Sequence, residues 1–132
     1  MKYLVVDPST TTRRAIVRAL RPLECEEYRE AATLADGLAS FDESVNVVIV
    51  GWDPPAFDGL GLARELRAQP AGATLPIVLV TSRNEKARVL EAVEAGVNGY
   101  FLRPFSPDQL RERVRALTTV EESGETEEAK AA

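Results

Sequence analysis

Three polar side chains that could do chemistry stand directly after short apolar runs of the sequence. Asp7, Thr81 and Arg103 each follow such a run, and a fourth run is followed by Gly51, which has no side chain. A carboxylate can bind a hard cation, and a guanidinium can bind a carboxylate through two parallel hydrogen bonds. The chain has no histidine and one cysteine, Cys25, so a disulfide framework, a zinc cluster and histidine-dependent catalysis are excluded. We interpret Cys25 as a small apolar filler.

The apolar runs alternate with segments of helical spacing, which is typical of βα units around a parallel sheet. The runs are short and rich in β-branched residues, and they predict strands at Tyr3–Val6, Val45–Val50 and Leu75–Val80, with weaker ones at Glu27–Glu30 and Gly99–Leu102. The helical segments between them are Thr11–Leu20, Leu34–Phe41, Leu60–Gln69, Glu85–Ala95 and Pro107–Leu117. Gly96 is expected to end the fourth helix in a left-handed conformation, and Ser106 before Pro107 to cap the fifth.

This alternation brings the polar residues together. The carboxyl ends of parallel strands lie at one edge of the sheet, where ligands bind in open α/β proteins. We therefore expect Asp7, Gly51, Thr81 and Arg103 to meet at that edge.

Length and charge indicate one domain, at residues 1–118, followed by an acidic segment at 119–132. The net charge is −5, and the last fourteen residues supply −4 of it through five glutamates and one lysine. We expect that segment to be a disordered tail, with a linker to a further domain as the alternative. The nearly balanced body gives no electrostatic footprint for nucleic acid. No apolar run reaches the ~18 residues that a membrane helix requires, so we expect a cytoplasmic protein.

At these positions the sequence resembles the receiver domains of response regulators, most closely the single-domain chemotaxis type, over nearly its full length. The resemblance rests on four groups of residues: LVVD ending at Asp7 with Thr11, Arg13 and Arg14; Trp52 with Pro55, Phe57, Asp58 and Gly59; Leu75, Pro76 and Val80 to Ser82; and Ala95, Gly96, Gly99, Tyr100, Arg103, Pro104 and Phe105. It implies a flavodoxin-like, doubly wound (βα)5 sandwich of three layers with a parallel five-stranded sheet. It also implies a signalling module of two-component phosphorelays that is not an enzyme.

The resemblance also exposes three departures at the sheet edge. In the family an acidic pair after the first strand holds magnesium, and here that pair is Asp7 and Pro8. An aspartate at the end of the third strand accepts the phosphoryl group, and here that position is Gly51. A lysine ends the fifth strand, and here it is Arg103, whereas the hydroxyl residue of the fourth strand is retained as Thr81. The resemblance therefore implies a degenerate receiver without its phosphoacceptor.

These departures predict altered chemistry. Magnesium requires several oxygen ligands in near-octahedral geometry, and Asp7 alone should bind it weakly, so we expect no metal and no cofactor. We predict that Arg103 pairs with Asp7 or Asp53, with a solvent-exposed Arg103 as the alternative. Asp53 is interpreted as a loop residue that caps or turns the chain near Pro54. The first hypothesis is therefore an interaction module that signals through its surface without accepting phosphate. The second is residual phosphotransfer to Asp53 or Asp7 from a histidine kinase or a small phosphodonor.

Two further interpretations come from the family. Thr81 and Tyr100 form its switch, although Tyr100 could equally be an ordinary half-buried strand aromatic. The family's contact face joins the fourth helix, fifth strand and fifth helix. In this chain it would include Arg88, Glu91, Tyr100, Arg111 and Arg115, and could bind other signalling proteins, a histidine kinase or a second copy in a homodimer. A flavodoxin-like cofactor site is disfavoured because Pro8 interrupts the loop where a phosphate would bind.

Overall fold

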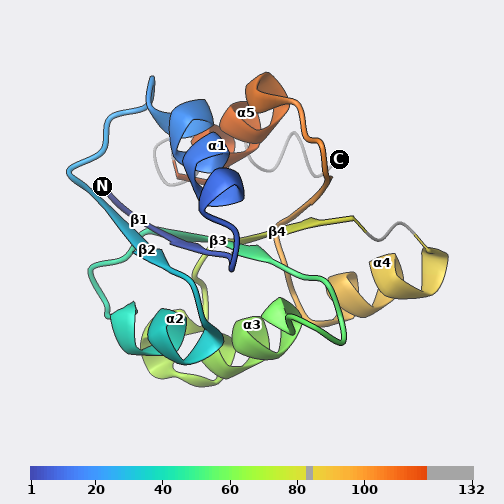
Figure 1. The fold of residues 1–132 in the computed structure, drawn as a ribbon. Helices are drawn as coiled ribbons and strands as arrows, with labels where there is room; N and C mark the ends of the chain where they lie inside the picture. The colour runs from blue at the N-terminus through green and yellow to red at the C-terminus, as the bar shows by residue number, and fades with distance from the viewer. Residues whose placement is uncertain (83–84, 119–132) are drawn as a thin grey trace, which may run out of the picture.

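The computed structural model describes residues 1–82 and 85–118, and within them five parallel strands form one sheet covered by helices on both faces (Figure 1). The strands are β1 (Lys2–Val6), β2 (Glu27–Ala31), β3 (Val47–Gly51), β4 (Ile77–Thr81) and β5 (Gly99–Leu102). The helices are α1 (Thr10–Leu20), α2 (Leu34–Ser40), α3 (Gly59–Ala68), α4 (Lys86–Glu94) and α5 (Pro107–Thr118), with a 3₁₀ turn, η1 (Pro70–Gly72). The acidic segment 119–132 lies outside the described residues.

The strand order is β2-β1-β3-β4-β5. The chain adds β2 on one side of β1 and then β3, β4 and β5 on the other, so the topological switch point lies between β1 and β3. Figure 1 shows α1 and α5 on one face of the sheet, and α2 and α3 on the other. The predicted α/β sandwich with a parallel five-stranded sheet is confirmed. Crevices at such switch points, beyond the carboxyl ends of the strands, are the usual ligand sites of this architecture.

The central strands are buried on both faces, which explains their continuous apolar sequence. In β1, Leu4 and Val6 pack in the cluster beneath α2 and α3, whereas Tyr3 and Val5 pack in the cluster beneath α1 and α5. The side chains of β3 and β4 alternate in the same way between the two clusters. The sheet is thereby fixed between two apolar layers, and its edge holds the polar residues in place.

The element boundaries differ from the sequence prediction by one or two residues. Val45 is buried but donates its N–H to Asp42 O in a turn, and β3 begins two residues later. Leu75 likewise donates to Gly72 O, which delays β4 to Ile77. Both predicted strand starts were therefore early, because apolar residues can be buried in turns as well as in strands.

The predicted caps are confirmed. Gly96 has φ 85°, the left-handed conformation expected after α4. The Ser106 hydroxyl accepts a hydrogen bond from the Gln109 N–H at 3.2 Å at the start of α5. None of the helices in the described part of the chain combines the length and apolar character needed to cross a membrane.

Candidate functional site at the carboxyl edge of the sheet

Asp7 follows β1 and is almost fully buried, with 1% of its surface exposed. Its Oδ1 atom accepts a hydrogen bond from the Ser9 N–H at 2.8 Å, which turns the chain at Pro8 toward α1. Its Oδ2 atom is buried and has no hydrogen-bond partner among the described residues. Arg13, one turn into α1, donates to the Asp7 carbonyl oxygen at 2.6 Å and so ties the helix to the strand end.

Burial raises the pKa of the Asp7 carboxyl above its ordinary value. The Ser9 N–H and the positive charges of Arg103 and Arg13 lower that pKa, whereas the negative charge of Asp53 raises it. Desolvation is the largest of these effects, because a charge taken out of water loses more than partial pairing returns.

Gly51 is the last residue of β3 and lies beside the Asp7 carboxylate. Val6 and Val50 are register partners in neighbouring strands, so the residues that follow them stand side by side. A Cβ atom built on Gly51 would lie well inside van der Waals contact of Asp7 Oδ2. The Asp7 carboxylate thus occupies space that any side chain at position 51 would need.

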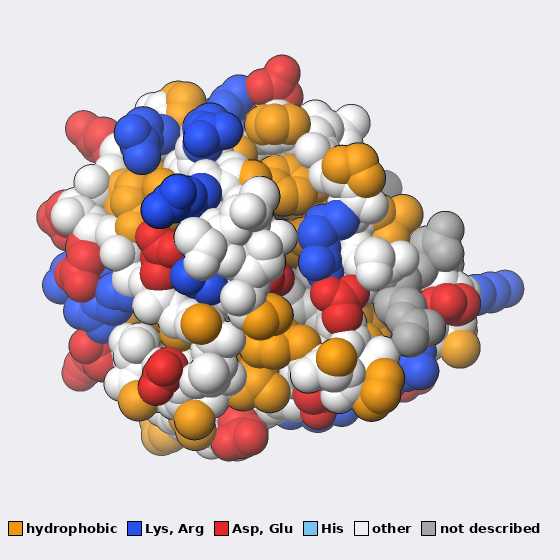
Figure 2. All heavy atoms as spheres, in the orientation of Figure 1, with side chains coloured by type: hydrophobic (Ala, Val, Ile, Leu, Met, Phe, Trp, Pro, Cys, Tyr) orange, Lys and Arg blue, Asp and Glu red, His pale blue; other side chains and the backbone are white. Residues whose placement is uncertain are grey.

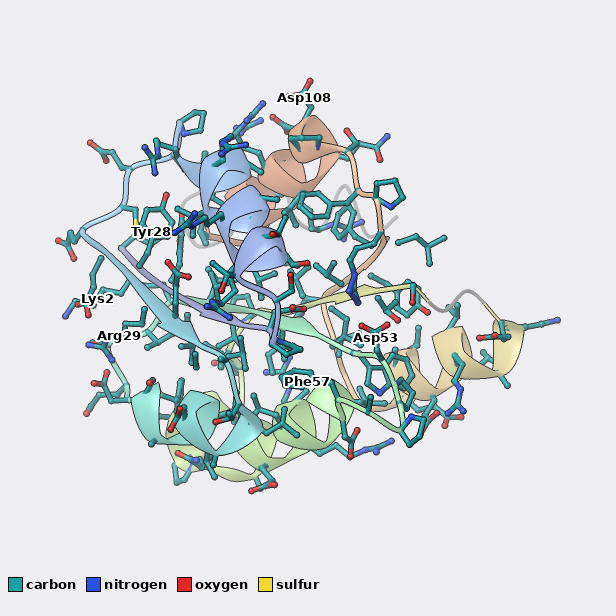
Figure 3. All side chains as sticks on the ribbon, in the orientation of Figure 1. Lys2, Tyr28, Arg29, Asp53, Phe57 and Asp108 are labelled. Carbon is teal, nitrogen blue, oxygen red and sulfur yellow. The ribbon has the colours of Figure 1, made fainter. Side chains whose placement is uncertain are left out.

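Asp53 connects three loops at the same edge (Figure 3). Its backbone forms an isolated antiparallel bridge with Phe57, with N–H···O distances of 2.9 Å in both directions, which closes the turn at Pro54 and Pro55. Its Oδ1 atom accepts hydrogen bonds from the Ser82 N–H at 3.2 Å and from the Ser82 hydroxyl at 2.9 Å. The predicted turn is present, but the side chain bridges to β4 instead of capping its own loop.

Arg103 pairs with Asp53, one of the two partners predicted for it. The Nη2 atom donates to Asp53 Oδ2, and both side chains are about a quarter to a third exposed. Nη2 also lies 3.4 Å from Val80 O, and the Arg103 N–H donates to Thr81 O at 2.8 Å. The guanidinium therefore lies against the carboxyl end of β4. We call Asp7, Gly51, Asp53, Thr81 and Arg103 the sheet-edge site.

The two switch candidates differ in their burial. Thr81 is fully buried at the end of β4, whereas Tyr100 is half-buried in β5 and packs against the cluster beneath α2 and α3. Burial raises the pKa of the Tyr100 phenol, with a smaller contribution from Glu85. This position of the ring fits both interpretations made from the sequence, a switch residue and an ordinary strand aromatic.

The predicted contact face needs a correction at α5. Arg111 donates to Ala19 O at 2.9 Å, so it faces α1, and Arg115 shares that side of α5 by its four-residue spacing. Arg113, in contrast, donates to Asn98 O beside β5. The sequence pattern separated the polar residues of α5 from its buried apolar ones, but not the direction in which each polar side chain points.

The part of the face on α4 and β5 carries features that the sequence analysis missed. Arg88 and Glu91 pair within α4 at 3.3 Å. Three large apolar side chains are also exposed, Leu90 (51%) and Val93 (63%) on α4 and Leu102 (41%) on β5. Within α4 the buried residue is Ala92. The spacing of apolar residues along the helix could therefore have shown that Leu90 and Val93 point away from the core.

This geometry defines a doubly wound α/β protein with its polar residues at the switch point of the sheet. The sequence model of the response regulator receiver domain family matches residues 3–115 of this chain. A chemotaxis protein CheY homolog of Campylobacter jejuni is 40% identical over 116 residues, which cover 86% of this chain and 89% of that protein. Chemotaxis protein CheY1 of Helicobacter pylori strain J99 is 36% identical over 119 residues, covering 89% and 96%. The chain therefore belongs to the response regulator receiver domain family.

Solved structures agree with that fold. A putative response regulator from Chloroflexus aurantiacus superposes with a TM-score of 0.79 at 28% identity, covering 89% of this chain and 97% of that one. CheY4 of Vibrio cholerae superposes with a TM-score of 0.76 at 24% identity, covering 88% and 97%. Receiver domains are modules of two-component signalling, and that class applies to this chain.

Proposed function

We propose that this receiver domain signals through protein contacts without accepting a phosphoryl group. The observation that carries the proposal is Gly51, which ends β3 at the position where the family resemblance puts the phosphoacceptor aspartate. Glycine has no side chain to form an acyl phosphate. The Asp7 carboxylate occupies the space beside Gly51, so a side chain at position 51 would require Asp7 to move.

The two remaining carboxylates are poor replacements for the nucleophile. Both oxygens of Asp53 are engaged, one by Ser82 and one by Arg103. Asp7 is buried beneath the loop that follows β1, where a phosphodonor has no approach to its oxygens. Phosphorylation of either residue would require the sheet-edge site to rearrange.

The donor set also fits magnesium poorly. Asp7 Oδ2 is a carboxylate oxygen without a hydrogen-bond partner among the described residues, but it is buried, and neither Pro8 nor Gly51 has a side chain that could bind a metal. Arg103 brings a permanent positive charge to the place where a cation would be attracted. Magnesium prefers near-octahedral oxygen coordination, so we propose that the Arg103 guanidinium takes over the neutralising role of a metal.

The partner surface in this proposal is the face of α4 and β5, together with the edge of α5 that adjoins it. The exposed apolar side chains of Leu90, Val93 and Leu102 support it, since large apolar groups left at a surface are candidates for protein contacts. The partner is another signalling protein, a histidine kinase or a second copy of the chain. The proposal includes the cytoplasmic location expected from the sequence.

Intact mass spectrometry after treatment with acetyl phosphate and magnesium tests the proposal. We expect no adduct of one phosphoryl group, and no change in the fluorescence of Trp52, which adjoins Gly51 and is buried, when magnesium and beryllofluoride are added. A stoichiometric adduct would overturn it. Asp53→Asn and Asp7→Asn variants would then identify which carboxylate had accepted the group.

A further inference from the structure

A groove of about 650 Å³ runs between α1 and the segment that joins β5 to α5, and it shares only Arg103 with the sheet-edge site. Its walls are largely apolar. On one side are Ala15 and Ala19 of α1, whose small side chains leave the space open, and on the other are Pro104, Phe105 and Pro107. A volume of this size with apolar walls is typical of sites for small molecules.

Three guanidinium groups lie around this groove. Arg18 is exposed and forms no ion pair with any described residue. Arg111 pairs with Asp108, but Asp108 is 86% exposed, so water screens that pair and a competing anion can replace it. Arg103 extends from the sheet-edge site to the end of the groove. Figure 2 shows Lys and Arg side chains gathered over α1 on this face of the molecule.

The other polar groups at the groove are compatible with an anion. Thr11 and Thr12, in the first turn of α1, line it with hydroxyl groups. No carboxylate is among the described residues that line the groove, and Asp53 and Asp108 each pair with one of the arginines that do. The excess charge of the groove is therefore positive, and its walls are apolar.

We propose that this groove binds a small amphipathic anion, with a flat apolar body of about two fused rings and one carboxylate or phosphate group. The rings would pack between Ala15 and Phe105, where burial of apolar surface contributes about 25 cal/mol per Å². The anionic group would be held by Arg18 and Arg111, whose planar guanidinium groups suit carboxylate and phosphate oxygens. Binding in the groove stands whether or not the protein accepts phosphate.

Arg103 couples the groove to the sheet-edge site. The rings of the bound anion would pack against Phe105, two residues after Arg103, and a shift of this segment would weaken the Arg103–Asp53 pair and loosen the contacts from Asp53 to the Ser82 N–H and hydroxyl. Ser82 directly follows Thr81, the buried residue at the end of β4. Binding of a ligand in the groove would therefore change the surroundings of the carboxyl end of β4. Ligand binding and the Arg103–Asp53 pair are coupled, and each affects the equilibrium of the other.

The test is a titration of the ¹⁵N-labelled protein of residues 1–132 with 1-naphthoate, followed by the amide signals of Ala15, Ala19 and Phe105. We expect saturable shifts at these residues and a smaller, parallel shift at Ser82. A parallel titration with 1-naphthyl phosphate distinguishes which anionic group is preferred. The uncharged 1-naphthylmethanol, which keeps the rings and loses the charge, should bind at least about fivefold more weakly, since hydrogen bonds to charged groups are the stronger ones.

Variants separate the groove from general surface binding. Arg18→Gln should weaken 1-naphthoate binding at least about fivefold, and because Arg18 is exposed the variant should fold normally. The matched control is Arg115→Gln, on α5 and paired with Glu112 at 2.6 Å outside the groove, which should bind as the wild type does. Equal binding of the neutral probe, shifts that do not saturate, or an unchanged affinity in Arg18→Gln would each overturn the proposal.

Discussion

At the residue scale, Gly51 is a position where a single carbon atom should matter. A Cβ there meets Asp7 Oδ2, and Asp7 cannot turn away freely because its other oxygen is held by the Ser9 N–H. We expect Gly51→Ala to lower the free energy of unfolding by about 1–3 kcal/mol, the usual result of overpacking, as measured by urea denaturation.

Two variants test the cause of that loss. In the Asp7→Ala, Gly51→Ala double variant the obstructing carboxylate is gone, so the combined loss should be smaller than the sum of the single losses. In Gly59→Ala the new Cβ would meet the backbone carbonyl of Gly51, which cannot rotate away, so its loss should exceed that of Gly51→Ala. Strict additivity between positions 7 and 51 would contradict the contact.

The buried Asp7 carboxyl also predicts a pH dependence. Its pKa is raised in the folded protein, so the folded state binds this proton more tightly than the unfolded chain does. Ionisation of Asp7 therefore costs stability at pH above the folded pKa, and that cost disappears as the pH falls through the folded pKa toward the ordinary aspartate value.

Asp7→Asn removes the ionisation and keeps the shape of the side chain. We expect this variant to be more stable than the wild type at pH 7, and the difference to shrink as the pH is lowered across that window, in urea denaturation at several pH values. A difference that stays constant with pH would show that desolvation of the charge is not what distinguishes the two side chains.

At the element scale, Arg67 of α3 joins parts of the chain that are distant in sequence. Its guanidinium donates to Gly72 O at 3.0 Å, to Gly96 O at 2.7 Å and to Asn98 Oδ1 at 2.8 Å, as well as to Leu75 O. Asn98 Oδ1 in turn accepts from the Ile77 N–H at 2.8 Å. One side chain thus ties α3, the start of β4 and the turn before β5 together.

We expect Arg67→Met to lower the free energy of unfolding by at least about 2 kcal/mol, because several partly buried acceptors would lose a charged donor. The matched control is Arg64→Met on the same helix. Arg64 is 52% exposed and its pair with Glu91 is long, at 3.9 Å, so the change should stay within about 0.5 kcal/mol. Similar losses in the two variants would contradict a special role for Arg67.

Some features of these elements can be predicted from the sequence and others cannot. The caps at Gly96 and Ser106 were predictable because they depend on backbone conformation and neighbours within four residues. The meeting of Asp7 and Gly51 was predictable because parallel strands end at one edge. The Arg67 contacts were not, since they join residues up to 31 positions apart through side-chain geometry that no local pattern encodes.

The candidate site divides in the same way. Charge and strand position limited the partner of Arg103 to two carboxylates, Asp7 and Asp53. The sequence does not show which of them the guanidinium reaches, and in the structure it is Asp53. The bond from Ser82 to Asp53 crosses from β4 to the loop after β3 and has no sequence signal. The side of α5 that carries Arg111 was misjudged because exposed residues around a helix look alike in sequence, whichever neighbour they face.

At the scale of the whole molecule, the two outer surfaces of the sandwich differ in character. The surface at α1 carries exposed arginines, Arg14, Arg18 and Arg21, whereas the surface at α4 and β5 exposes large apolar side chains. The first suits anions, and the second suits another protein surface with apolar groups. If both proposals hold, the anion and the partner protein would bind to separate parts of the surface.

The apolar surface predicts self-association. A two-fold pairing of α4 and β5 would bury Leu90, Val93 and Leu102 and bring the charges of Arg88 and Glu91 opposite their copies. We expect size-exclusion chromatography with light scattering to show a concentration-dependent dimer.

The Leu90→Glu, Val93→Glu double variant should remain monomeric, with a nearly unchanged urea midpoint because both side chains are exposed in the monomer. Arg14→Glu, an equally exposed charge change on α1, should still form the dimer. A wild type that stays monomeric at millimolar concentration would rule out the homodimer and leave a different protein as the partner of this face.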